Sequence, residues 1–135
     1  MGLKLKIDFE ALKKLSDKIK SFTNAGKNDL CKEISQELGV NLLRRTVLKT
    51  PVDTGNLRRN WKQSGHDIKN GYESIVFNQT EYAVYVEFGH RTRNKTGWVD
   101  GRYMLSNSVE EVDKMSKEIV EKHVKKALGD IFNDK

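Results

Sequence analysis

The residue types that carry most enzyme and metal chemistry are sparse in this sequence and lie far apart. His66, His90 and His123 fall in three different predicted elements, whereas a zinc site usually draws Cys or His ligands in pairs a few residues apart. Cys31 is the single cysteine, so an intrachain disulfide is impossible, and its position on an apolar helical stripe favours a core or interface role. We therefore expect neither a metal nor another cofactor.

The best candidates for an acid–base pair, Asp53 and Glu87, are far apart in the sequence and give only a weak signal for catalysis. Glu87 lies at a predicted strand end, where an ion pair with Arg58, Arg59 or an arginine of the following loop is the simpler interpretation. The glycines are too widely spaced for a phosphate-cradling loop. We expect the protein not to be an enzyme.

A basic segment without hydrophobic periodicity extends from Gly89 to Gly101. It predicts a long mobile loop, and loops of this length are more often functional or ordered by a partner than idle. Cations around an aromatic side chain can also follow a phosphate backbone, although the sequence has no recognition helix and no paired stacking aromatics. The candidate interface residues of this loop are His90, Arg91, Arg93, Lys95, Trp98, Arg102 and Tyr103.

The length and composition predict one domain with a strongly hydrated surface. The chain has 135 residues, of which 36% are hydrophobic and 33% charged, with a net charge of +6 and a pI near 9.4. This balance suits an elongated protein, or one whose core is completed by neighbours. No signal-peptide pattern and no apolar run of about 18–20 residues is visible, so we expect a cytoplasmic protein without a membrane partner.

Helical periodicity dominates the two ends of the chain. Ile7 opens a first predicted helix, and the residues 23–28 interrupt it with turn formers. A second helix is predicted from about Asp29 to Pro51, and Gly39 within it indicates either a kink or a close packing contact. The last helix is predicted to start near residues 106–108, with a capping-box pattern at Asn107 and Ser108, and to end at Gly129.

The middle third favours strands. Leu57–Lys62, Tyr72–Asn78 and Tyr82–Phe88 are rich in β-branched and aromatic residues, and Asn70–Gly71 is a strong hairpin signal. Both faces of Tyr82–Phe88 carry apolar residues, which predicts a central strand. The expected fold is therefore α+β: N-terminal helices, a three- to four-stranded antiparallel sheet, and a long C-terminal helix packed on it. Residues 1–28 would form the N-terminal helix and linker, 29–128 the core and 129–135 a tail.

The segment Thr50–Trp61 has the residue order of a helix-to-strand corner. Pro51 ends the helix, and Asp53 and Thr54 can fold their side chains back onto nearby amides. Gly55 permits the positive φ of a tight turn, after which Leu57 is expected to begin a strand. By itself the corner indicates no activity.

The corner is followed by a second motif, Tyr82-Ala-Val-Tyr-Val-Glu-Phe-Gly89, and the pair resembles the HK97 gp10-like phage proteins. The resemblance covers about residues 30–128. Its motif positions are Thr50, Pro51, Asp53, Thr54, Gly55, Leu57, Tyr82, Glu87, Phe88 and Gly89. Members commonly carry prolines and a Phe before the last helix, where this chain has Gly-Arg-Tyr-Met-Leu, so Tyr103 would take the role of the aromatic residue.

The resemblance implies a virion protein of the neck or tail, assembled in the cytoplasm of a bacterial host. Proteins of this kind form rings, commonly hexameric, that complete the tail and join it to the head, with DNA passing through the centre. The implied partners are other copies of the chain, head connector or adaptor proteins, and a tail terminator or tail tube protein. The alternatives are a small basic protein that binds nucleic acid non-specifically, and a tail terminator or minor capsid component.

Overall fold

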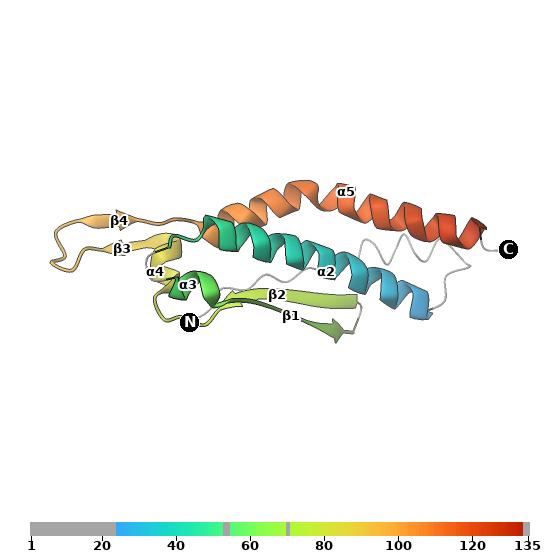
Figure 1. Ribbon diagram of the computed structural model, residues 1–135, viewed down its shortest axis with the longest axis horizontal. Coiled ribbons are helices and arrows are strands. Elements are labelled where there is room, and N and C mark those ends of the chain that lie inside the picture. The colour runs from blue at the N-terminus through green and yellow to red at the C-terminus, as the bar shows by residue number, and fades with distance from the viewer. Residues whose placement is uncertain (1–23, 53–54, 70, 134–135) are drawn as a thin grey trace.

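The computed structural model describes residues 24–52, 55–69 and 71–133, which form an elongated molecule with two long helices side by side (Figure 1). The first helix predicted from Ile7 lies outside the described residues. The described elements are α2 (Asn24–Lys49), α3 (Asn56–Arg59), β1 (Trp61–Ile68), β2 (Gly71–Asn78), α4 (Ala83–Phe88), β3 (Gly89–Arg91), β4 (Trp98–Asp100) and α5 (Met104–Asn133). None of the described helices combines the length and apolar character needed to cross a membrane.

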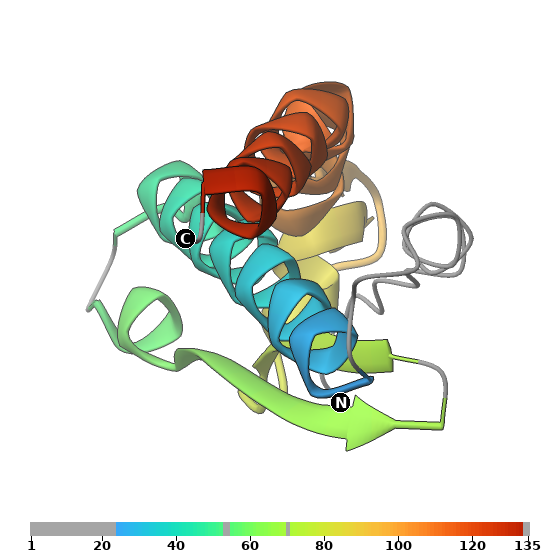
Figure 2. The same cartoon turned by 90° about the vertical axis from the view of Figure 1, so that its right-hand side faces the viewer.

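The core lies between α2, α5 and the first hairpin. Ile34, Leu38 and Leu42 recur every four residues on α2, so they share one face of the helix and are buried. Figure 2 shows α2 between α5 and the hairpin, which explains why this stripe is buried. The buried cluster contains Leu30, Cys31, Ile34, Leu38, Leu42, Leu57, Trp61, Val76, Ala83, Met104, Leu105, Val112 and Ile119.

Strands β1 and β2 form an antiparallel hairpin whose register runs from Trp61 opposite Asn78 to Ile68 opposite Gly71. The hairpin predicted at Asn70–Gly71 is therefore confirmed. Gly39 brings α2 close to the sheet: a Cβ atom at this position would lie 2.3 Å from the Gln63 side chain and 3.1 Å from the Ser74 Cβ. Close packing against the hairpin therefore explains why a glycine occupies this position in the helix.

The α+β class is confirmed, but the sheet differs from the prediction. Two separate two-stranded sheets replace one sheet of three to four strands. Leu57 lies in the short helix α3 rather than in a strand, and the predicted strand Tyr82–Phe88 is helical over α4. Tyr82, Tyr85 and Phe88 recur at steps of three, which also fits a helix face. That face is exposed, so the prediction that this segment is a central strand, covered on both faces, was wrong.

The ends of the long helices also differ from the predictions. Asn24 begins α2, so the predicted break at residues 23–28 is largely helical, and α5 continues past Gly129 to Asn133. At its other end α5 begins at Met104, before the predicted capping box. The Ser108 hydroxyl instead donates to the Met104 carbonyl oxygen, within the first turns of the helix.

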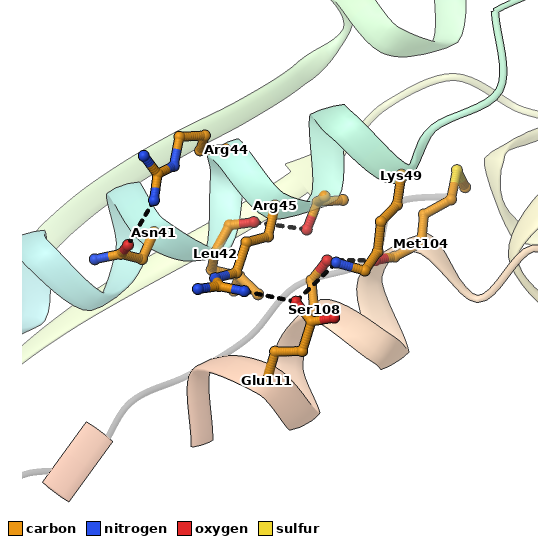
Figure 3. A network of polar contacts seen from close by, with 9 residues as sticks. Asn41, Leu42, Arg44, Arg45, Lys49, Met104, Ser108 and Glu111 are labelled. Carbon is orange, nitrogen blue, oxygen red and sulfur yellow. Dashed lines mark hydrogen bonds and ion pairs between the residues drawn. The ribbon is translucent and has the colours of Figure 1, made fainter. Parts of the chain in front are cut away.

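A polar contact fastens the C-terminal half of α2 to α5 (Figure 3). The Glu111 carboxylate on α5 accepts hydrogen bonds of 2.8 Å from both Arg45 and Lys49 on α2. The bond from Lys49, followed by that from Arg45, lowers the pKa of Glu111. Toward the opposite end, Glu37 of α2 contacts Lys122 and His123 of α5, and the bond from Lys122 is the main cause that lowers the pKa of Glu37.

Replacing Glu111 by Gln should lower the melting temperature at neutral pH, because a neutral side chain forms no ion pair with Lys49 or Arg45. Folding lowers the pKa of the Glu111 carboxylate. Its contribution to the stability of the fold is therefore complete above the ordinary pKa of 4.5, and it is lost as the pH falls through the lower pKa of the folded state. Thermal unfolding followed by circular dichroism should therefore show a difference between parent and variant that shrinks below pH 4.5.

The matched control is Glu110→Gln, since Glu110 meets only the exposed Lys114 at 3.8 Å in an ion pair within one helix. Such pairs contribute little to stability. Equal melting-temperature losses in the two variants, or a difference that does not depend on pH, would contradict the assigned contact.

Candidate assembly interface

The Thr50–Trp61 corner is held by side chains that bond to the end of α2. The Trp61 indole N–H donates to the Thr50 hydroxyl oxygen at 2.8 Å, and this hydroxyl donates to the Thr46 carbonyl at 2.6 Å. Arg58 donates to the carbonyl oxygens of Val47 and Thr50 at the C-terminal end of α2, and the Val47 carbonyl also accepts from the Thr50 N–H at 3.2 Å. Among the described residues of the corner, these bonds pair the buried side chains of Thr50 and Trp61.

Not all motif positions of the corner can be placed. Asp53 and Thr54 lie outside the described residues, and Pro51 is exposed. Gly55 has a φ of 79°, the positive value predicted for it. Leu57 is buried, and its carbonyl oxygen accepts a hydrogen bond of 2.8 Å from the Asn78 side chain.

Glu87 connects the second motif to the start of α5. Its side chain is fully buried, and its carboxylate accepts hydrogen bonds from the backbone N–H groups of Leu105 at 3.0 Å and Ser106 at 2.8 Å. The Ser106 hydroxyl donates to the same carboxylate at 2.7 Å. These amides belong to the first turn of α5, which has no partners for them within the helix. The negative charge also suits the positive end of the helix dipole.

This arrangement corrects the expected role of Glu87. The predicted ion pair with Arg58, Arg59 or a loop arginine is not the contact that the structure shows. Residue Tyr103 occupies the N-cap position of α5 with a φ of 48° and carries no side-chain acceptor for the helix amides. A carboxylate from α4 therefore takes the place of the usual N-cap side chain.

Two glycines let the chain cross itself where α4 meets the segment before α5. A Cβ atom on Gly89, which has a φ of 89°, would lie 2.6 Å from the Val99 carbonyl oxygen. One on Gly101 would lie 2.4 Å from the Glu87 carbonyl oxygen. The backbone N–H of Arg102 donates to the Val86 carbonyl at 2.8 Å. The crossing fixes the direction in which the chain leaves α4.

Beyond this crossing, β3 and β4 pair as an antiparallel hairpin that we call the arm, residues 89–100. The arm extends past the ends of α2 and α5 (Figure 1). The prediction of a long irregular loop was therefore wrong for the two ends of this segment. Its three residue pairs are too short to produce a visible period-two pattern, which explains why they were missed.

The root of the arm is rich in exposed aromatic side chains. Phe88 and Tyr103 contact each other edge to face, with ring centroids 6.4 Å apart, and Tyr85 contacts His90 in the same geometry. Trp98 is 59% exposed although it is one of the largest side chains in the protein. The exposed apolar residues of this region, which we call the root patch, are Tyr82, Tyr85, Phe88, Trp98, Val99 and Tyr103.

The predicted interface residues are thus brought to one end of the molecule, but not onto one surface. His90 and Tyr103 lie at the root, Arg91 and Trp98 lie opposite each other at the last strand pair, and Arg93 and Lys95 lie in the turn beyond it. Sequence reasoning missed Tyr82, Tyr85 and Phe88 as exposed neighbours because it placed them in a buried strand. Reading that segment at the helical period would have revealed their common face. Within the described ranges, no group of three or more His, Cys, Asp or Glu residues could hold a metal ion.

The structure is thus a small α+β fold with exposed aromatic side chains at the root of a projecting arm. A family model described as "Bacteriophage HK97-gp10, putative tail-component" matches residues 4–89, more than half of the chain. The chain belongs to this family of phage tail components. No curated protein and no solved structure matches it.

The match includes the corner and ends at Gly89, whereas the resemblance was expected to extend over about residues 30–128. The arm beyond Gly89 and the whole of α5 lie outside the matched residues. The family match therefore includes the corner, α4 and Glu87, but it does not include the arm beyond Gly89.

Replacing Glu87 by Ala should destabilise the fold by about 1–3 kcal/mol, because the buried Leu105 amide and its neighbour would lose their acceptor. Glu87→Gln retains one acceptor oxygen and should lose less. Chemical denaturation measures both, and Glu81→Ala, at an exposed position, is the control. An unfolding free energy unchanged in Glu87→Ala would rule out the capping role.

Proposed function

We propose that the protein is a non-enzymatic structural subunit of a phage particle that joins its neighbours at the head–tail junction through the arm. The root patch is the observation that carries this proposal. Single exposed apolar residues are normal on a protein surface, but several large exposed aromatics at one end of a molecule mark a candidate contact site. Tyr, Trp and Phe are enriched where protein interfaces are most deeply buried.

The position of the root patch favours assembly with other copies of the chain. An arm at one end of an elongated subunit can reach a different surface of the next copy, and such a head-to-tail contact closes into a ring when its rotation is suitable. A ring, commonly hexameric, with DNA passing through its centre is what the family resemblance implies. Connector or adaptor proteins on the head side, and tail terminator or tail tube proteins on the other, would then be its neighbours.

A tail terminator or a minor capsid component would use the same kind of apolar contact. The family membership establishes a tail component, and the place within the virion belongs to the proposal. Imaging of intact particles carrying a labelled chain distinguishes these positions directly. Label at the head–tail junction would support the proposal, and label on the capsid or along the tail would contradict it.

Trp98→Ala should abolish assembly while leaving the subunit folded. The side chain is 59% exposed, so its removal should change the unfolding free energy little, whereas truncating an interface anchor costs about 2 kcal/mol or more of association energy. Mass measurement in solution and the titre of infectious particles provide the two readouts. Val40→Ala is the matched control, because Val40 is 55% exposed and lies well before the end of α2 that is nearest the arm (Figure 1). A Trp98→Ala protein that still assembles into infectious particles would remove Trp98 as an anchor.

A further inference from the structure

The end of the arm differs chemically from its root. Residues 91–97, which we call the arm tip, contain Arg91, Arg93 and Lys95 and no apolar side chain larger than the methyl group of threonine. All three cations are exposed, and no acidic residue occurs between Gly89 and Gly97. In the part of the chain that the structure describes, none of the three forms an ion pair. The tip therefore presents three uncompensated positive charges.

Hydrogen bonds within the turn hold the backbone that carries these side chains. The Thr92 N–H donates to the Gly97 carbonyl at 3.0 Å, and the Lys95 N–H donates to the Thr92 carbonyl at 2.8 Å. The Asn94 side-chain oxygen accepts from the hydroxyls of Thr92 at 2.6 Å and Thr96 at 2.7 Å. A turn fixed in this way loses less conformational entropy when it binds a ligand than a mobile loop would lose.

We infer that the arm tip binds the phosphate backbone of double-stranded DNA without reading its sequence. Lys and Arg side chains that neutralise phosphates account for essentially all non-specific DNA affinity. A two-stranded ribbon also fits the major groove, which is about 12 Å wide. The Asn94 oxygen is engaged within the turn and is therefore not free to bind a base edge. The exposed charged groups that the tip offers to DNA are its three cations.

The distribution of exposed apolar side chains also distinguishes the root of the arm from its tip. The core of a protein–protein interface is enriched in aromatic side chains, and apart from Trp98, which lies opposite Arg91, the exposed aromatics lie at the root rather than in the turn. The inference rests on the proposed function for the identity of the nucleic acid, which is the phage genome where it passes the head–tail junction. The capacity of the arm tip to bind phosphate does not depend on that identity.

The lysines of α5 provide an internal comparison. Lys117, Lys125 and Lys126 are exposed as well, but acidic residues such as Glu118 and Glu121 alternate with them on the same helix. Their charge is therefore partly compensated along the helix, as expected for a solvated face. Removing three of these lysines changes the net charge of the protein by the same amount as removing the three cations of the tip.

The test uses the full chain and a fluorescently labelled duplex of about 30 base pairs, with binding followed by anisotropy over a series of NaCl concentrations. In the triple variant Arg91→Gln, Arg93→Gln, Lys95→Gln, affinity at low salt should fall about tenfold or more. The slope of log K against log salt should become shallower by roughly 2–3, because each phosphate contact contributes about 0.9. The control Lys117→Gln, Lys125→Gln, Lys126→Gln should retain most of the parent's affinity and slope.

Three outcomes would overturn the inference: no binding by the parent, equal losses in the two triple variants, or a tip variant that binds DNA like the parent. In the last case, a loss of co-assembly with other virion proteins would assign the tip to an acidic protein surface. Particle imaging separates the two proposals. A chain absent from the head–tail junction contradicts the proposed function whatever its DNA affinity, while a chain present there without tip-dependent binding contradicts only this inference.

Discussion

The position of the long helix α5 and the direction of the arm both depend on the buried Glu87 carboxylate. A helix that starts with Met104 and Leu105 in the core must satisfy its first amides without water, since both residues are buried. Tyr103 is at the N-cap position, but its only side-chain oxygen lies at the far end of the ring and does not cap the first amides of the helix. Glu87 supplies both acceptor oxygens from α4 and thereby fixes α4 against the start of α5.

This constraint determines which surface α4 presents to solvent. Because Glu87 and Ala83 lie one turn apart and face inward, Tyr82, Tyr85 and Phe88 must face outward. Gly89 then turns the chain away at a positive φ, and Gly101 brings it back against the α4 backbone. The Glu87 cap, the exposed aromatic face of α4 and the arm are therefore linked, because the buried Glu87 side chain sets the orientation of α4.

The sequence predicted the parts of the fold whose stability is local. The stripe of α2 and the hairpin at Asn70–Gly71 follow from spacing and residue type, whereas Gly39 indicated either a kink or a close packing contact. The sequence could not show that Glu87 caps a helix, because donor and acceptor lie in different elements and only the fold brings them together. The α4 segment was assigned to a strand since its β-branched and aromatic residues fit both periods, and tertiary contacts decided between them.

The candidate interface shows the same division between local and non-local information. Its residue types were evident, because a basic segment with one tryptophan stands out between two glycines. Its geometry was not, because only the pairing of β3 with β4 shows that Trp98 lies opposite Arg91 and that Arg93 and Lys95 lie in the turn beyond them. In an irregular loop these side chains would have no fixed order along the segment. Paired strands hold them in order, with the aromatic side chains of α4 at one end of the arm and the cations of the turn at the other.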